Sequence, residues 1–159
     1  MSEPGLVVGS PVGPLGLVED DGALAAVRFD AGPVGAGAGS PLLERAARQL
    51  QEYFAGTRRV FDLPLRPHGT DFQARVWAAV ARVPWGTTTT YGEIVRTLGL
   101  AAGSARAVGA ANGANPLPVV VPCHRVVGGD GSLTGYAGGL PRKEALLRLE
   151  GLGAQDPLF

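Results

Sequence analysis

Short apolar runs separated by turn residues fill the first thirty positions of the chain. Three runs, Gly5–Ser10, Leu15–Glu19 and Ala23–Asp30, have the length of strands. The last two flank Asp20-Asp21-Gly22, which is a hairpin signal. We therefore expect an antiparallel meander here, followed by a glycine-rich connector over 31–39 that is typical of a mobile surface loop.

Helical spacing replaces these short runs from Ser40 onward. Ser40 has a side chain suited to an N-cap, Pro41 suits the first helical position, and Gly56 ends the pattern. Val60–Leu65 then predicts an edge strand, which Pro64 confines to the rim of a sheet. Apolar residues at the spacing of one buried helix face are Leu43, Ala46, Ala47, Leu50 and Phe54.

Further helix starts follow Thr70. Thr70 and Gln73 have capping-box spacing. Thr90 and Glu93 repeat it, and Ser104 is a candidate cap for a third helix. The second and third of these helices, joined by a glycine-containing turn, predict a helix-turn-helix. A last helix is expected from Pro141 to Glu150, with Ala145, Leu146 and Leu149 on its buried face.

The candidate chemistry lies in Pro118–Val127, PVVVPCHRVV, which contains the only cysteine. Its β-branched residues predict a strand buried on both faces, with Cys123 at its end. A buried free cysteine is commonly a small core residue. His124 offers a second interpretation, because an imidazole can take the thiol proton directly or through water. Adjacent strand residues point to opposite faces, so this requires a backbone bend, for which Pro122 provides a reason.

Composition narrows the possible classes of protein. The 159 residues suit one domain or two small halves. Neither a signal peptide nor an apolar run of about 20 residues is found, so we expect a cytoplasmic protein without membrane contact. One cysteine excludes an internal disulfide and, with two histidines, leaves too few ligands for a structural zinc site.

Charge alone does not predict a nucleic-acid partner, because 14 basic residues balance 14 acidic ones. The distribution is mildly uneven, with eight basic against six acidic residues from position 71 onward. Between Ala105 and Ala114 nearly every side chain is Ala or Gly, apart from Arg106, Val108 and Asn112. Such a helix suits either close helix packing or entry into a DNA groove, where Arg106 would be the long cationic side chain.

Five segments together carry a family resemblance: FQARVW, TYGE, ARAVGAANGANPLPVVVPCHRVVG, GSLTGYAGGL and KEALLRLEG. They resemble the O6-alkylguanine-DNA alkyltransferases over residues 70–152, and PVGPLGLVEDDGALAAVRF is similar to the first domain of that family. The resemblance implies an α+β fold. A small antiparallel-sheet, ribonuclease H-like domain over 1–68 would precede a mostly helical domain over 69–159 that contains the helix-turn-helix and the active-site cysteine.

The resemblance also implies direct reversal of DNA damage without a cofactor. A monomer would bind double-stranded DNA containing O6-alkylguanine in the minor groove and flip the damaged nucleotide. It would then move the alkyl group irreversibly to its own cysteine, once per molecule, and act on O4-methylthymine as well. Flipping is physically required, because the reacting atom of a stacked base is out of reach.

Roles for individual residues follow from the same resemblance. Cys123 corresponds to the nucleophile, His124 to the base acting through water, and Glu150 to the carboxylate that orients it. Tyr91 corresponds to the donor to the departing guanine and Asn115 to a hinge that supports the site. The residues implied to contact DNA or the flipped base are Arg106, which fills the vacated stack, Ala105, Val126, Tyr136, Ala137 and, supporting their loop, Lys143.

Two other classes remain open. A lesion-binding relative without transfer activity would keep the helix-turn-helix and the pocket but would not need Cys123. A Cys-His-Glu hydrolase would turn over repeatedly and would ignore DNA. The stoichiometry of the reaction separates the hydrolase from a transferase, and an unchanged protein mass with bound DNA would indicate the lesion-binding relative.

Overall fold

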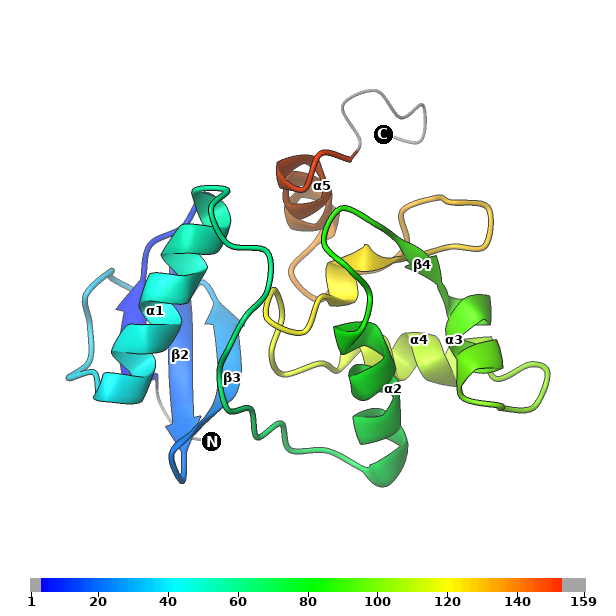
Figure 1. Cartoon of the computed structure of the whole chain (residues 1–159), viewed down its shortest axis with the longest axis horizontal. Helices are drawn as coiled ribbons and strands as arrows, with labels where there is room; N and C mark the ends of the chain where they lie inside the picture. Colours follow the sequence, from blue (N-terminus) through cyan, green and yellow to red (C-terminus); the bar gives the residue numbers. More distant parts are fainter. Residues whose placement is uncertain (1–3, 153–159) are drawn as a thin grey trace. The chain divides into compact units, whose positions relative to one another are not determined.

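The chain divides into two compact units, Met1–His68 and Gly69–Phe159. The structure, a computed structural model, describes residues 4–152. The first unit is a three-stranded antiparallel sheet with one helix, and the second is mostly helical (Figure 1). The fold is therefore α+β, as the sequence predicts.

The sheet of the first unit is a meander of β1 (Leu6–Val8), β2 (Leu15–Asp20) and β3 (Ala23–Phe29). In the antiparallel pairing of β2 with β3, Leu17 lies opposite Val27. Asp21 and Gly22 connect these strands with φ angles of 48° and 77°. Two left-handed residues in succession match a type I′ turn, whose twist suits a tight hairpin. The predicted hairpin is confirmed.

Helix α1 (Pro41–Phe54) crosses one face of this sheet (Figure 1). The Ser40 side chain accepts a hydrogen bond from the backbone N–H of Leu43 at 3.1 Å, so the predicted cap is present. The buried face differs in part from the prediction, because Tyr53 rather than Phe54 faces the core. Its buried side chains are Leu43, Ala46, Gln49, Leu50 and Tyr53.

One expectation for the first unit is wrong. Residues 60–65 form no edge strand beyond an isolated bridge between Leu24 and Leu65. The Gln49 amide binds both the N–H and the C=O of Asp62, so these backbone groups are not free for a ladder. The 31–39 segment is a mostly exposed loop without helix or strand, as predicted, and its Gly35 and Ala36 exchange backbone hydrogen bonds with Val7 of 2.8 and 3.0 Å.

Four α-helices, one 3-10 turn and two very short strands are the regular elements in the described part of the second unit. The strands β4 (Thr89–Thr90) and β5 (Val126–Val127) pair in parallel. Trp77 on α2 donates a 2.7 Å hydrogen bond to the carbonyl of Ala111 on α4, which joins these two helices. The helices are α2 (Asp71–Ala81), α3 (Tyr91–Thr97), α4 (Ala105–Gly113) and α5 (Leu140–Leu149).

The predicted caps of these helices have different outcomes. Thr70 forms a complete capping box with Gln73 at the start of α2. Thr90 accepts from the N–H of Glu93 at the start of α3, but the Glu93 carboxylate pairs with Arg96 instead of completing a box. Ser104 occupies the predicted N-cap position of α4, but its side chain makes no cap bond. The face predicted for α5 is also partly wrong, since Lys143 and Leu147 are buried while Ala145 is exposed.

The buried segment at the centre of the second unit is not the strand predicted for Pro118–Val127. Only Val126–Val127 are extended and paired, whereas Cys123–Arg125 form a 3-10 turn, η1. Val119 has a φ of 72°, a left-handed conformation that interrupts any strand before the cysteine. The apolar run predicts burial correctly but not conformation, because a buried turn and a buried strand can have the same composition.

Candidate active site

Cys123 is a buried free thiol in a tight turn. Pro122 has φ −80° and ψ 63°, so the backbone leaves the extended region one residue before the cysteine. The N–H of Cys123 then donates to the carbonyl of Val121 at 2.7 Å. A 3-10 turn has three residues per turn, so His124 is not forced onto the face opposite Cys123. The predicted bend is present.

His124 is held by Glu150, which lies at the end of α5. The distance from His124 Nε2 to Glu150 Oε2 is 2.8 Å, and the two side chains are 0 % exposed. A carboxylate only accepts, so Nε2 carries the proton and the lone pair of neutral His124 is on Nδ1. Among the residues that the structure describes, Nδ1 has no hydrogen-bond partner. His124 therefore presents a basic nitrogen inside the protein.

Arg125 and Gly86 also bind the Glu150 carboxylate. Arg125 donates from Nε to Oε1 at 2.8 Å and from Nη2 to Oε2 at 2.9 Å. The backbone N–H of Gly86 donates to Oε1 at 3.2 Å, and Arg125 Nη1 donates to the carbonyl of Val83 at 2.6 Å. Two-point contact with a guanidinium fixes both the charge and the orientation of Glu150, and hence of His124.

Two asparagines tie the reactive turn to α4 and to the chain after it. Asn115 donates from Nδ2 to the carbonyl of Val121 at 2.8 Å and accepts from the N–H of Leu117 at 2.9 Å. It thus holds together the two ends of the segment before Cys123. Asn112 Nδ2, on α4, donates to the carbonyl of Cys123 at 3.3 Å.

Burial and the neighbouring polar groups shift the pKa of the Cys123 thiol in opposite directions. Burial raises the pKa of Cys123 above its usual value, because a thiolate loses hydration there. Hydrogen bonding with Asn115, the charge of Lys143 and hydrogen bonding with Tyr136 each lower that pKa. Burial lowers the pKa of His124, although Glu150 opposes this effect. The resting site therefore holds a protonated thiol and a neutral imidazole near pH 7.

Lys143 is a fully buried amine on α5. Its Nζ donates to the carbonyl of Val126 at 2.6 Å and to the carbonyl of Thr134 at 3.1 Å. Among the described residues no carboxylate pairs with it, and burial lowers its pKa to about 8. Lys143 therefore links α5, β5 and the glycine-rich loop, and its positive charge favours a Cys123 thiolate.

Tyr91, the first residue of α3, points its hydroxyl at the same loop. Its oxygen lies 2.6 Å from Thr134 Oγ1. The backbone of α4 passes close to the ring, because a Cβ added at Gly109 would lie 3.6 Å from Tyr91 Cε1. The absence of a side chain at Gly109 thus brings the alanine-rich helix near Tyr91.

The remaining candidates lie at different depths. Arg106 and Ala105 are exposed at the start of α4, away from the hydrogen bonds around Cys123. Val126 is completely buried, and its carbonyl already accepts from Lys143. Tyr136 is partly buried beside the thiol, and burial raises its pKa, whereas Ala137 is exposed. The structure brings Tyr136 to Cys123 but does not bring Arg106 or Ala105 there.

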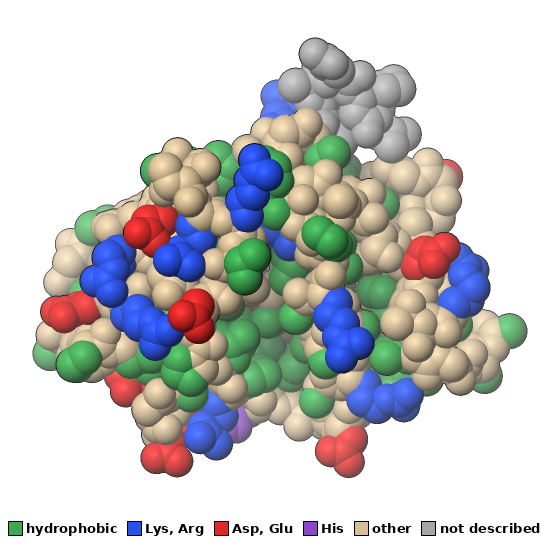
Figure 2. Space-filling model, in the orientation of Figure 1, with side chains coloured by type: hydrophobic (Ala, Val, Ile, Leu, Met, Phe, Trp, Pro, Cys, Tyr) green, Lys and Arg blue, Asp and Glu red, His purple; other side chains and the backbone are tan. Residues whose placement is uncertain are grey.

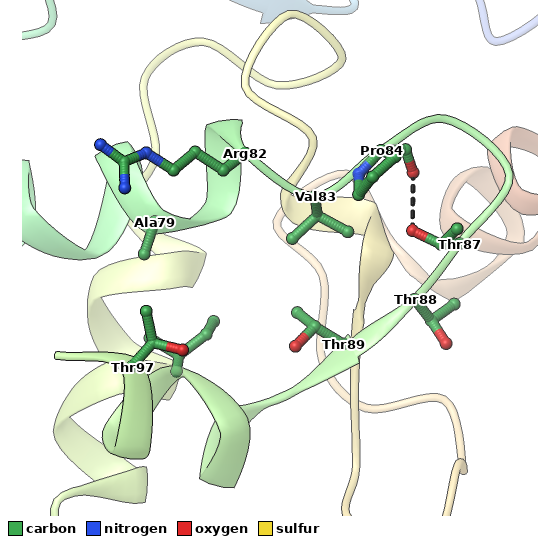
Figure 3. Close-up of a pocket in the computed structure, with 9 residues that line it drawn as sticks. Ala79, Arg82, Val83, Pro84, Thr87, Thr88, Thr89 and Thr97 are labelled. Carbon is green, nitrogen blue, oxygen red and sulfur yellow. Dashed lines mark hydrogen bonds between the residues drawn. The ribbon is translucent and has the colours of Figure 1, made fainter.

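A separate cavity of about 290 Å³ lies between α2, α3 and β4. The side chains of Ala79, Val83, Thr89 and Thr97 point toward a common space, while Thr87 binds the carbonyl of Pro84 (Figure 3). Cys123 and His124 do not line it. This cavity therefore lies beside the reactive centre, and the carbonyl of its lining residue Val83 accepts from Arg125.

Four residues around the centre have no role in the sequence prediction: Arg125, Gly86, Asn112 and Thr134. A signal existed for Arg125, because a guanidinium in an apolar segment needs a buried carboxylate. Gly86 acts through its backbone N–H, Asn112 through its bond to a carbonyl, and Thr134 through its hydroxyl. The partner of each is distant in sequence. Local patterns do not reveal such contacts.

Within residues 4–152, no three His, Cys, Asp or Glu side chains are grouped so that they could hold a metal ion. In the same range no helix has the length and apolar character needed to cross a membrane. On the face in Figure 2, basic side chains are interspersed with acidic ones, in keeping with the zero net charge of the chain.

Models of two protein families match this chain in succession. The ribonuclease-like domain of 6-O-methylguanine DNA methyltransferase matches residues 7–67. The DNA binding domain of 6-O-methylguanine DNA methyltransferase matches residues 71–152 and so includes Cys123, His124 and Glu150.

Similar proteins and structures agree with these matches. A methylated-DNA--protein-cysteine methyltransferase of Methanosarcina acetivorans is 47% identical over 148 residues, which is 89% of this chain and 94% of that protein. One of Mycobacterium tuberculosis is 57% identical over 105 residues, 66% of this chain and 63% of that protein. The crystal structure of Mycobacterium tuberculosis OGT in complex with DNA superposes with a TM-score of 0.82 at 46% identity, covering 91% of this chain and 90% of that one. Because each of its two units matches a domain of the same family, this chain belongs to the 6-O-methylguanine DNA methyltransferase family.

Proposed function

We propose that this protein repairs DNA by moving the alkyl group from O6-alkylguanine, and from O4-methylthymine, to its own Cys123. The observation that carries the proposal is the buried thiol next to an imidazole whose Nε2 is held by Glu150 and whose Nδ1 is unoccupied. This is the arrangement of nucleophile, base and orienting group that activates a weak nucleophile.

The reaction begins with proton removal from the thiol. His124 Nδ1 takes the Cys123 proton, directly or through a water molecule, and Glu150 stabilises the imidazolium that forms. The thiolate then attacks the alkyl carbon, a C–S bond forms, and the C–O bond breaks with its electron pair left on guanine. His124 returns its proton to solvent and guanine gains one, so the sum is thiol plus O6-alkylguanine to thioether plus guanine.

Tyr91 is proposed to assist the leaving group. A departing purine carries developing negative charge, and a positioned hydroxyl donor lowers the energy of that charge. The product thioether has no leaving group that a neighbouring base could expel. Each protein molecule therefore reacts once and is consumed.

We further propose that α3 and α4 act as a helix-turn-helix on DNA. The exposed residues of α4 include Ala105, Ala107 and Ala110, whose small side chains suit a minor groove only about 6 Å wide. Arg106 is exposed beside them and has the length to fill the space left by a flipped base. Cys123 is only 5% exposed, so a base that stays stacked in DNA could not reach its sulfur. A flipped base could enter the protein and reach it.

The flipped guanine is proposed to bind between β5 and the loop that follows it. Val126, Tyr136 and Ala137 would form this pocket, and Lys143 would anchor the loop through Thr134. Entry requires that the glycine-rich loop move, which its glycines permit. Action as a monomer and a cytoplasmic location stay predictions, and gel filtration checks the first.

The deciding experiment is intact mass spectrometry after incubation with a duplex containing one O6-methylguanine. We expect a gain of one methyl group in place of a hydrogen, located on the Cys123 peptide and limited to one per molecule. The Cys123→Ala variant should bind the same duplex without a change in mass. Binding without mass change in the wild type would instead indicate a lesion-binding protein. Repeated hydrolysis of an ester substrate without DNA would indicate a hydrolase.

A further inference from the structure

We propose that Thr134 is a positioning residue for alkyl transfer, acting on the leaving group by donating a hydrogen bond to the hydroxyl oxygen of Tyr91. This inference deepens the proposed function and rests on it, because it assigns a partner to the residue that meets the departing guanine. Thr134 lies in the loop after β5, and Tyr91 lies 43 positions earlier at the start of α3.

The contact between the two hydroxyls is short and partly buried. Tyr91 Oη and Thr134 Oγ1 are 2.6 Å apart, near the usual O–H···O distance. Each hydroxyl has one proton to donate, and only one of them can donate across this contact. If Thr134 donates, the Tyr91 proton is free for a third atom. In the proposed reaction that third atom is an acceptor on the base that enters the site.

The backbone of Thr134 is fixed independently of its side chain. Its carbonyl accepts from Lys143 Nζ at 3.1 Å, and the same amine donates to Val126 at 2.6 Å. Lys143 is itself fully buried on α5. The carbonyl of Thr134 is therefore tied to the buried amine of Lys143, and this contact holds the backbone that carries the Thr134 hydroxyl beside Tyr91.

A hydrogen bond accepted by Tyr91 has a specific chemical effect. It stabilises negative charge on the phenol oxygen and so strengthens the hydrogen bond that Tyr91 donates in turn. That strengthening matters only when the leaving group needs a proton or a donor. It does not alter the nucleophile, because the pKa of Cys123 is lowered by Asn115 and Lys143 and its proton is proposed to pass to His124.

This separation gives a direct test with two methyl donors. O6-methylguanine in a duplex has a leaving group that needs a donor, whereas iodomethane releases iodide and needs none. We expect Thr134→Val, which keeps the shape but removes the hydroxyl, to slow single-turnover transfer from the duplex about 5- to 10-fold, the range for loss of one hydrogen bond of typical net strength. Methylation of Cys123 by iodomethane should proceed at the wild-type rate.

Three variants complete the experiment. Thr134→Ser should restore transfer, because it restores the hydroxyl. Thr88→Val should leave both rates unchanged, since Thr88 is an exposed threonine at the rim of the separate cavity. In a Tyr91→Phe background, Thr134→Val should cause no further loss, because the residue through which it acts is gone.

Several results would overturn the assignment. Wild-type transfer rates in Thr134→Val would show that the hydroxyl is not needed. Equal slowing with iodomethane would place the effect on the thiol or on the fold. Full additivity with Tyr91→Phe would show that Thr134 acts elsewhere. Failure of the proposed function is distinguishable, since the wild-type protein would then transfer no methyl group from the duplex while still reacting with iodomethane, and the role of Thr134 would fall with it.

Discussion

His124 Nε2 donates to Glu150 Oε2 across 2.8 Å, which leaves Nδ1 as the basic nitrogen of the ring. The two residues are 26 positions apart, and α5 delivers the carboxylate to the turn that contains the thiol. Arg125 binds both oxygens of the same carboxylate. One acidic residue therefore sets the tautomer of the base and balances the charge of its neighbour.

The first prediction concerns pH. Burial lowers the pKa of His124 below 6.5, so the imidazole stays neutral and able to accept a proton down to that pH. The rate of methyl transfer should therefore hold between pH 7.5 and 6.5 and fall only below 6.5, as the imidazole becomes protonated. Rapid-quench single-turnover assays across this pH range measure the transfer rate. A rate that already halves above pH 7 would contradict a neutral, buried base.

Glu150→Gln should move that acid limb to still lower pH, because Glu150 raises the pKa of His124. The plateau rate should drop by at least about 10-fold, since general-base catalysis as a whole supplies about 10²- to 10⁴-fold. Circular dichroism of the variant serves as the control for folding. A lower rate with an unmoved acid limb would argue against direct coupling of the two residues.

Arg125→Met should destabilise the second unit. The substitution removes the two hydrogen bonds that Arg125 donates to the buried Glu150 carboxylate. Breaking a buried ion pair from one side costs about 3–5 kcal/mol. Urea denaturation measures the change in the free energy of unfolding. The matched control is Arg148→Met, which removes an exposed pair with Glu144 and should have a much smaller effect. Equal changes in the free energy of unfolding of the two variants would contradict this prediction.

Lys143→Met should make the thiol less reactive near neutral pH. The charge of Lys143 lowers the pKa of Cys123, so its removal raises that pKa, and each unit of increase reduces the thiolate fraction about tenfold. The rate of Cys123 methylation by iodomethane should fall at pH 7. The difference from wild type should shrink as pH rises through about 8, where Lys143 itself loses its proton. A difference that is constant from pH 6 to 10 would exclude an effect of charge.

Methylation of Cys123 should lower thermal stability. Cys123 is 5% exposed, so a methyl group has to be accommodated in packed surroundings, and overpacking typically costs about 1–3 kcal/mol. Differential scanning calorimetry before and after reaction with methylated duplex, with the DNA removed, measures the change. An unchanged or higher Tm after reaction would mean that the site has room for the product.

Local elements follow from the sequence because their determinants are close together along the chain. The Asp21-Gly22 turn, the Ser40 cap and the Thr70–Gln73 capping box all form between residues at most three positions apart. Family motifs extend this to the identity of the reactive residues, since PCHRV places cysteine and histidine side by side. Composition also predicts correctly that the segment around Cys123 is buried.

The same composition fails to predict the conformation of that segment. Buried valines suit a strand, yet the groups that satisfy the backbone here are Asn115 and Asn112, with η1 in place of a ladder. In the first unit, Gln49 similarly occupies the backbone of Asp62 and prevents an edge strand. In each case a polar side chain from another element competes with sheet pairing.

The sequence by itself determined the two-part α+β organisation, the hairpin, the start of α2 and the candidate reactive pair Cys123 and His124. Only the tertiary structure decided that Arg125 and Gly86 share Glu150 and that Thr134 meets Tyr91. The physical reason is distance along the chain: turns and caps form between near neighbours. Burying charges and hydroxyls requires partners that only the packed fold brings within about 3 Å.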